Sequence, residues 1–250
     1  MIEIRNLSIT FNPGSEQELR ALQHVDLQIP QGQFVILLGS NGSGKSTLLN
    51  ALAGSLSPER GNGAILIHNQ NVTYKAVHQR SSYIGRIFQQ PSDGVASDLS
   101  VLENFRLAAL RTSSKGLKVG TGKAFRDQVA SHVSILNMGL ENRLDRPIGS
   151  FSGGQRQALS LLMATYVKPK LLLLDEPTAA LDPKSAETVF TLACSIIKEQ
   201  ELTALLVTHD LRHCTRAGDR IVQLSEGKII RDEKGFSQHA MSLADIQEWF

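Results

Sequence analysis

One stretch near the N-terminus constrains the fold of this chain more than any other. Residues 34–39, FVILLG, form a short apolar run that ends at a glycine, and residues 39–47 read GSNGSGKST. The run KSTLLNALAG at residues 45–54 then has the character of a helix. A strand, the pattern G-x-x-x-x-G-K-[ST] and a helix in this order predict a phosphate-binding loop (P-loop) in an α/β protein.

Each residue type in this loop has a physical role in holding phosphate. Glycines let backbone N–H groups turn inward around a phosphate chain. The lysine places a positive charge near the β and γ phosphates, and the hydroxyl after it is a ligand for Mg²⁺. We therefore predict nucleotide binding by Gly39, Ser40, Asn41, Gly42, Ser43, Gly44, Lys45, Ser46 and Thr47.

Composition and length narrow the class of protein. The 250 residues suffice for one large α/β domain, or for one core with a smaller satellite. The net charge of +2 gives no argument for bulk nucleic-acid binding. We expect no signal peptide and no membrane span, because no apolar run approaches about 20 residues. Cys194 and Cys214 fall in helix-like segments, and we interpret them as thiols in a reducing compartment.

The order of the apolar segments indicates a mostly parallel sheet. Helical patterns fill residues 92–165, which we interpret as a subdomain inserted in that core. Residues 221–230 read as a hairpin with its turn near Glu226 and Gly227. The other expected strands lie at residues 2–11, 24–29, 34–39, 64–69, 171–176 and 204–210. The expected helices lie at residues 45–54, 97–110 (beginning after Asp98 or Ser100), 123–139 and 184–200.

Two later strand ends carry polar residues. LLLLDE, residues 171–176, places Asp175 and Glu176 after a buried strand. There Asp175 can hold Mg²⁺, and Glu176 can orient and deprotonate a water molecule. Taken alone, the pair indicates a helix cap equally well, and the upstream P-loop favours catalysis. His209 ends the next strand, and a lone histidine there is more often structural than catalytic.

Three other stretches bear on the site or on the packing of the chain. FSGGQRQALS, residues 151–160, resembles a second loop that feeds a helix N-terminus, where anions bind. VGTGKAF, residues 119–125, lacks a preceding strand and has Ala124 in place of Ser or Thr; its GK lies in the glycine- and lysine-rich stretch RTSSKGLKVGTGK, residues 111–123, which we interpret as a solvated loop. SLADIQEWF, residues 242–250, predicts a short helix capped by Ser242 with Asp245. Its apolar face packs on the chain's own body or, alternatively, on another subunit.

The ordered set of motifs resembles one family. GSNGSGKS, the glutamine Gln89 in RIFQQP, FSGGQ, LLLLDE, AALD and THD occur in this order. Together they resemble the ATP-binding subunit of ABC transporters, from the first strand to about residue 230. The resemblance implies a P-loop NTPase of ABC type, with a RecA-like core, an N-terminal antiparallel β subdomain and an inserted α-helical subdomain. This ATPase domain would cover residues 1–235, with a helical tail at 236–250.

The resemblance also explains a second anion site. In this family two ATPase subunits pair head to tail, and the signature loop of one subunit caps the γ-phosphate on the other's P-loop. A homodimer would therefore contain two such shared sites. Phe151 stands where the family usually has leucine, which is an apolar exchange. Asp182 resembles the D-loop aspartate that acts across the dimer. The signature residues are Ser152, Gly153, Gly154 and Gln155.

The remaining roles follow the family's motifs position by position. Gln89 resembles the Q-loop glutamine, which contacts Mg²⁺ or water and couples to the transmembrane subunit. Asp175 would support the metal and Glu176 would be the general base. His209 resembles the switch histidine that contacts the γ-phosphate. Phe11 resembles the aromatic residue that stacks on adenine, and a phenylalanine in the core of a strand is the alternative.

These features predict the ATP-hydrolysing subunit of a transporter. The resemblance implies ATP and Mg²⁺, a homodimer, integral membrane permease subunits and, through them, an extracytoplasmic solute-binding protein, but no nucleic acid. The chain would lie on the cytoplasmic face of the inner membrane. NVTYKAVHQR and RQALSLLMATYVKPKLLLLDE resemble ATPases of bacterial importers of aromatic amino acids or related small solutes. The cargo and the direction of transport stay open.

A soluble ABC-type ATPase of DNA repair or translation is the alternative. Repair members carry long heptad coiled coils between the P-loop and the signature, and this sequence has none. Translation members usually carry two ATPase units in one chain, and this chain has one. A P-loop kinase or another NTPase is a third possibility, against which FSGGQ argues.

Overall fold

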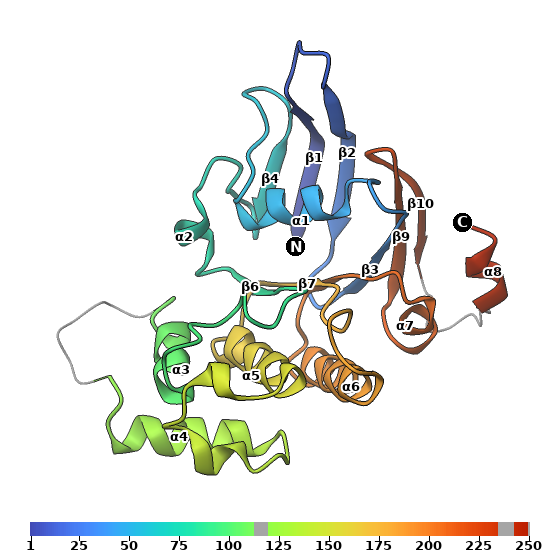
Figure 1. Cartoon of the computed structure of the whole chain (residues 1–250). Coiled ribbons are helices and arrows are strands. Elements are labelled where there is room, and N and C mark those ends of the chain that lie inside the picture. The colour runs from blue at the N-terminus through green and yellow to red at the C-terminus, as the bar shows by residue number, and fades with distance from the viewer. Residues whose placement is uncertain (113–119, 235–242, 250) are drawn as a thin grey trace. The chain divides into compact units, whose positions relative to one another are not determined.

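The computed structural model describes residues 1–112, 120–234 and 243–249 (Figure 1). They form two compact units. The first unit contains the described residues of Met1–Ile84, Lys170–Glu176 and Glu201–Phe250. The second contains those of Gly85–Pro169 and Pro177–Gln200, and is wider than the predicted subdomain at residues 92–165.

An antiparallel sheet begins the first unit, with strand order β2-β1-β4-β5. Its strands are β1 (Ile2–Phe11), β2 (Leu19–Ile29), β4 (Ala64–Ile67) and β5 (Gln70–Asn71). The prediction for residues 2–11 is confirmed, whereas β2 begins five residues before the predicted start at residue 24. His24 adopts a φ of 49°, and the register with β1 shifts in this part of the pair. The irregularity breaks the alternation of polar and apolar residues, which hid the first half of β2.

The second sheet of this unit is mostly parallel, with the order β10-β9-β3-β8-β7. β3 (Phe34–Leu38), β7 (Leu171–Asp175) and β8 (Ala204–Val207) confirm three predicted strands, and β3 and β8 are buried along their whole length. β9 (Arg220–Ser225) and β10 (Lys228–Lys234) form the predicted hairpin, with its turn at Glu226 and Gly227. β6 (Ile84–Ile87) crosses the boundary between the two units.

Helix α1 (Lys45–Ala53) joins both sheets in one hydrophobic core. It confirms the predicted helix and ends at Gly54, which adopts the left-handed conformation common after a helix. Its last carbonyl groups bind Arg80, at the end of α2 (Val77–Arg80): Nη1 donates to Ala51 O at 2.6 Å and to Leu52 O at 2.7 Å. Burial lowers the pKa of Arg80 to about 10, so this cation stays charged at neutral pH.

The second unit is largely helical (Figure 1). Its helices are α3 (Val101–Ala109), α4 (Lys123–Ser134), α5 (Gly153–Tyr166) and α6 (Pro183–Glu199), with the 3₁₀ turns η1 (Leu140–Arg143) and η2 (Ile148–Ser150). Ser100 caps α3, as one of the two predicted alternatives. The prediction of one helix over residues 123–139 is wrong in its end, because tight turns after Ser134 and a φ of 52° at Asn137 stop α4.

The two cysteines lie in helices, as predicted. Cys194 lies in α6 and is partly buried, and Cys214 lies buried in α7 (Leu211–Arg216); the two do not form a disulfide. Burial raises the pKa of Cys214 to about 12. In the GK stretch at residues 119–125, Lys123 is the first residue of α4, and residue 119 lies outside the described part of the chain.

The C-terminal helix α8 (Leu243–Gln247) lies beside α7 in the first unit (Figure 1). Ile246 is fully buried, and the carbonyl of Trp249 accepts a 2.8 Å hydrogen bond from Gln223 Nε2. The Arg231 guanidinium lies 5.0 Å from the centre of the Trp249 ring. The tail therefore packs on its own chain, while Ser242, the predicted cap, lies outside the described residues. Within the part of the chain that the structure describes, every helix is too short or too polar to span a bilayer.

Candidate active site

The P-loop connects β3 to α1, and two of its glycines, Gly39 and Gly44, leave no room for a Cβ. Gly39 is buried with a φ of 154°, and a Cβ there would lie 2.3 Å from Leu224 O and 2.5 Å from Ser43 Oγ. Gly44 has a φ of 105°, and its Cβ would lie 2.5 Å from Ala21 O. Close backbone approach thus shapes the loop, as the sequence pattern requires.

Lys45 lies inside this loop. Its Nζ donates to Gly39 O at 2.7 Å and to Ser40 O at 2.8 Å, and the residue is 7% exposed. Burial lowers the pKa of Lys45, while the negative charges of Glu176 and Asp175 act in the opposite direction. The lysine therefore interacts electrostatically with both carboxylates at the end of β7, although these lie more than a hundred residues further along the sequence.

The loop also contains polar groups that make no hydrogen bond within the described chain and could bind a ligand. Ser43 Oγ is buried and, within the described chain, has no hydrogen-bond partner. α1 begins at Gly44 without a side-chain cap, so its first N–H groups lack the usual partner. Ser46 is exposed at the start of the helix. A buried lysine, an unpaired hydroxyl and an uncapped helix start together suit a bound anion.

Glu176 and His209 meet at the ends of adjacent strands. Glu176 follows Asp175 at the end of β7, adopts a φ of 44°, and its N–H donates to Val207 O at 3.0 Å. His209 Nδ1 lies 3.1 Å from Glu176 Oε1. The Glu176 side chain is 17% exposed, whereas that of His209 is 67% exposed. A left-handed backbone at a non-glycine residue is uncommon, and it directs this carboxylate away from the line of the strand.

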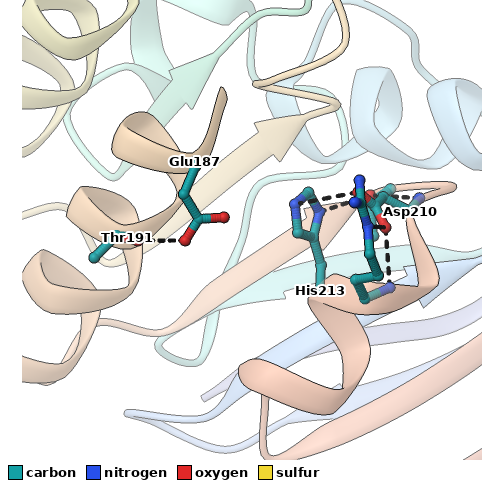
Figure 2. Close-up of polar contacts among 6 residues, drawn as sticks. Glu187, Thr191, Asp210 and His213 are labelled. Atoms are coloured by element: carbon teal, nitrogen blue, oxygen red, sulfur yellow. Dashed lines mark hydrogen bonds and ion pairs between the residues drawn. The ribbon is translucent and has the colours of Figure 1, made fainter. Parts of the chain in front are cut away.

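A cluster beyond His209, which sequence reasoning missed, fixes the start of α7. Arg212 Nη2 donates to Asp210 Oδ2 at 2.7 Å, and this pairing lowers the pKa of Asp210 to about 2. His213 Nε2 lies 3.8 Å from Asp210 Oδ2, and its Nδ1 lies 3.1 Å from Thr208 Oγ1. Figure 2 shows Asp210 and His213 facing each other. The spacing of Asp210 and His213, three residues apart at a helix start, is the signal that could have indicated the pair.

The signature stretch begins α5 with a capping box. Ser152 Oγ accepts from Gln155 N at 3.3 Å, and Gln155 Oε1 accepts from Ser152 N at 3.1 Å. Gly153 and Gly154 occupy the first helical positions. Phe151 is buried, which suits its apolar replacement of leucine. The predicted loop-to-helix arrangement is therefore present, and its serine also caps the helix.

Gly154 lies where α5 approaches α6. A Cβ at Gly154 would lie 2.6 Å from both Cβ and Oγ of Ser185, whereas one at Gly153 would lie 3.4 Å from Leu181. Asp182 caps α6, because its Oδ1 accepts from Ser185 N at 3.1 Å. Hydrogen bonds from the side chain of Ser185 and from its backbone N–H lower the pKa of Asp182. Further along α6, Thr191 Oγ1 donates to Glu187 Oε1 at 3.2 Å (Figure 2).

The other two candidates lie at the ends of strands. Gln89 is exposed in the second unit, two residues after the end of β6. Phe11 ends β1 and packs, partly buried, against the core of the first unit. This packing agrees with the alternative that Phe11 is a strand residue, and it leaves part of the ring accessible.

Known proteins resemble this chain in sequence and in fold. The model of the family described as ABC transporter matches residues 22–179. This chain belongs to the ABC transporter family. A tyrosine transport ATP-binding protein of Clostridioides difficile is 37% identical over 254 residues, which cover 100% of this chain and 98% of the relative. An ATP-binding protein of a lipoprotein-releasing system, LolD 1 of Caulobacter vibrioides, is 32% identical over 244 residues, 95% of this chain and 99% of the relative.

The solved ABC cassettes confirm the fold. A dimeric ATP-binding cassette in a post-hydrolysis state, bound to ADP and Pi, matches with a TM-score of 0.78 and 30% identity. The match covers 94% of this chain and 98% of that cassette. The chain is thus an ABC ATPase with a P-loop α/β core, and its substrate and cofactor are ATP and Mg²⁺.

The residues present fit these ligands in this ABC ATPase. Ser43 Oγ and the glycine-rich loop suit phosphate oxygens, and a Cβ at Gly39 would lie 2.5 Å from that hydroxyl oxygen. Ser46 and Asp175 offer hydroxyl and carboxylate oxygens, the ligand types that Mg²⁺ prefers. The P-loop, Asp175, Glu176 and His209 belong to the first unit. Gln89, the signature stretch and Asp182 belong to the second.

Proposed function

We propose that this ABC ATPase works as a head-to-tail homodimer that drives solute movement through separate membrane subunits. The observation that carries the proposal is the Glu176–His209 pair, 3.1 Å apart, in the same unit as a P-loop whose lysine feels the charge of Glu176. A carboxylate in contact with a histidine beside a phosphate site can activate water for attack on a γ-phosphate.

The P-loop residues would bind the phosphate chain. The Lys45 ammonium, which now donates to two loop carbonyl groups, would donate to β and γ phosphate oxygens instead. Glycine N–H groups and the Ser43 hydroxyl would complete the cradle. Phe11 would stack on adenine with its accessible face. Nucleotide binding would therefore exchange two hydrogen bonds within the loop for bonds from the same ammonium group to phosphate.

Ser46, Asp175 and Gln89 would hold Mg²⁺. When bound there, the cation would supply positive charge against the phosphate oxygens. Glu176 would accept a proton from the attacking water, and His209 would contact the γ-phosphate while its ring keeps the carboxylate oriented. The Glu176 backbone, held to Val207 O, supplies the rigid support that a general base requires.

The signature residues Ser152, Gly153, Gly154 and Gln155 would cap ATP on the P-loop of the partner subunit. No basic side chain among them supplies charge, so they would add hydrogen bonds to a nucleotide that another P-loop already holds. Asp182 would act across the same dimer interface. The solved relative that is dimeric with ADP and Pi supports this arrangement.

The cargo is proposed from the relatives' names. The tyrosine transport relative matches along nearly its whole length, which supports an amino acid or a related small solute as the cargo, and we propose import as the direction. The chain would lie on the cytoplasmic face of the inner membrane, bound to permease subunits that receive cargo from an extracytoplasmic solute-binding protein. The lipoprotein-releasing relative, at 32% identity, makes export the competing direction.

Light scattering on a Glu176→Gln variant tests the shared site. We expect monomers without nucleotide, and a dimer that persists with Mg-ATP because hydrolysis no longer opens it. Replacing Ser152 in addition should dissolve that dimer. If Glu176→Gln binds ATP and stays monomeric even with the permease subunits present, the head-to-tail proposal is wrong.

Co-purification tests the transport assignment against the soluble alternative. We expect the ATPase to bind a multispanning permease encoded beside its gene, and its ATPase activity to rise in the reconstituted complex. Stimulation by DNA or ribosomes, without a response to that permease, would favour a role in repair or translation.

A further inference from the structure

Gln157, on the helix that the signature loop begins, joins that helix to two other segments. It is 1% exposed, and its side-chain Nε2 donates at 2.8 Å to Phe88 O and at 2.8 Å to Pro177 O. An amide nitrogen carries two hydrogens, so these two bonds use its full donor capacity. All three residues belong to the second unit.

The two carbonyl groups stand next to residues of the proposed chemistry. Phe88 directly precedes Gln89, and Pro177 directly follows Glu176. Both lie just beyond the end of a strand, β6 and β7 respectively, where the backbone has left the sheet. One side chain of α5 therefore holds the backbone beside the metal-binding glutamine and beside the general base.

We propose that Gln157 is a positioning residue for ATP hydrolysis. It ties the start of the segment bearing Gln89 and the segment after Glu176 to α5, so a shift of the signature helix moves both. This inference rests on the roles proposed above for Gln89 and Glu176. Buried carbonyl groups are rarely left unpaired, so loss of the amide would release both segments to find new partners.

Ser160, one turn further along α5, contacts the same region without hydrogen bonding. It is 5% exposed, and its Oγ has no hydrogen-bond partner among the described residues. A Cβ at Gly94 would lie 3.5 Å from Ser160 Oγ and 3.6 Å from the Phe88 ring. Ser160→Ala therefore changes a buried atom on the same face of α5 while removing no bond, which makes it a matched control.

The first test is the ATPase activity of Gln157→Met, which keeps the length of the side chain but has no donor. We expect kcat to fall about 10- to 100-fold, because small misplacement of reacting groups is costly. The KM for ATP should stay within about two-fold, since the P-loop lies in the other unit. Ser160→Ala should keep both constants. If Gln157→Met retains the wild-type kcat, or loses only thermal stability, Gln157 is merely structural and the inference is overturned.

The second test uses pH and remains decisive if Gln157→Met does not fold. In Gln157→Glu, an ionised carboxylate would face two carbonyl oxygens, and burial among them would raise its pKa. The neutral acid can donate to one of the two, so activity relative to wild type should rise as pH falls from about 8 to about 6. A ratio that is flat or falls over this range overturns the inference.

Glu176→Gln, assayed beside these variants, separates the two proposals. If it abolishes turnover while Gln157→Met and Gln157→Glu behave as wild type, the proposed function stands and only the inference about Gln157 fails. If Glu176→Gln retains wild-type kcat, the general-base role is itself wrong, and the proposed function fails first.

Discussion

Helices α1 and α5 begin in opposite ways, although both follow glycine-rich loops. α1 starts at Gly44 with no side-chain cap and carries Lys45 in its first turn. α5 starts at Ser152 with a complete capping box. The start of α1 therefore keeps N–H groups and a cation for a ligand, whereas much of the hydrogen-bonding capacity at the start of α5 is already used.

If the signature stretch caps ATP on a partner subunit, as proposed above, this difference would let one chain carry two anion sites without competition between them. The α1 site has charge and can bind a nucleotide alone. The α5 site offers N–H groups and a hydroxyl, which add to binding only where phosphate is already held. The asymmetry suits a shared site in which each subunit holds one nucleotide and closes over another.

The largest expected loss of ATPase activity follows replacement of Lys45, the cation at the start of α1. Lys45→Met should lower kcat/KM by about 10²- to 10³-fold, as removal of a preorganised donor does elsewhere. The contrast with α5 predicts that nucleotide binding by the monomer is also lost, which fluorescent ATP analogues would measure. Arg156→Met, next to the signature, is the control and should leave monomer binding intact. Loss of monomer binding in the control would end the distinction between the two sites.

An added side chain at Gly154 should disturb the packing of α5 against α6, whereas one at Gly153 should not. Gly154→Ala drives a methyl group into Ser185 on α6 and should lower the free energy of unfolding by about 1–3 kcal/mol. Gly153→Ala should change it by less than about 0.5 kcal/mol. Urea unfolding measures both, and a cycle with Ser185→Gly should recover part of the loss in Gly154→Ala. Equal effects of the two alanines would show that the close approach is not the constraint.

Asp210 caps α7 and adds a charge pair that α5 lacks. Its folded pKa of about 2 lies below the ordinary aspartate value of 3.8, so the stabilisation it contributes is present above pH 3.8 and is lost as pH falls through about 2. Solvent screens the partly exposed pair, so Asp210→Asn should lose only about 0.5 kcal/mol near neutral pH and nothing at the acid limit. Carboxyl NMR titration should show the pKa of Asp210 moving up towards its ordinary value in Arg212→Met, because the largest cause of its lowering is the Arg212 side chain. A pKa still near 2 in that variant would assign the shift to another partner.

The smallest expected change in stability follows replacement of Asp182, which caps α6. Asp182→Ala removes the hydrogen bond to Ser185 N and should lower the melting temperature slightly, while Asp182→Asn keeps an acceptor and should preserve it. Calorimetry on both variants separates the capping role from the proposed role across the dimer. ATP-driven dimerisation that fails in Asp182→Asn, at unchanged stability, would identify the charge as the functional feature.

The sequence predicted best the elements whose signals are local. Gly54 ends α1, Ser100 caps α3, and Glu226 with Gly227 turns the hairpin, because each position determines its own backbone conformation. Helix α4 shows the limit. Buried Leu136 continues its apolar spacing beyond Ser134, yet the chain there forms tight turns, which periodicity does not distinguish from a helix.

The candidate site was predictable residue by residue but not in its contacts. The motifs identified Glu176 and His209 separately, and their 3.1 Å approach depends on β7 and β8 lying side by side. The amide of Gln157 bridges backbone groups that are 69 and 20 residues away in sequence. No local pattern encodes such a bond, since the partners are carbonyl groups that every residue possesses.

The docking of Trp249 has a consequence for spectroscopy. The chain contains one tryptophan, and its indole lies against the Arg231 side chain at the end of α8. Intrinsic emission excited at the red edge of protein absorption therefore reports on the environment of the C-terminal segment alone. An emission change during titration with nucleotide or denaturant measures release of that segment, and circular dichroism is needed beside it to follow the rest of the molecule.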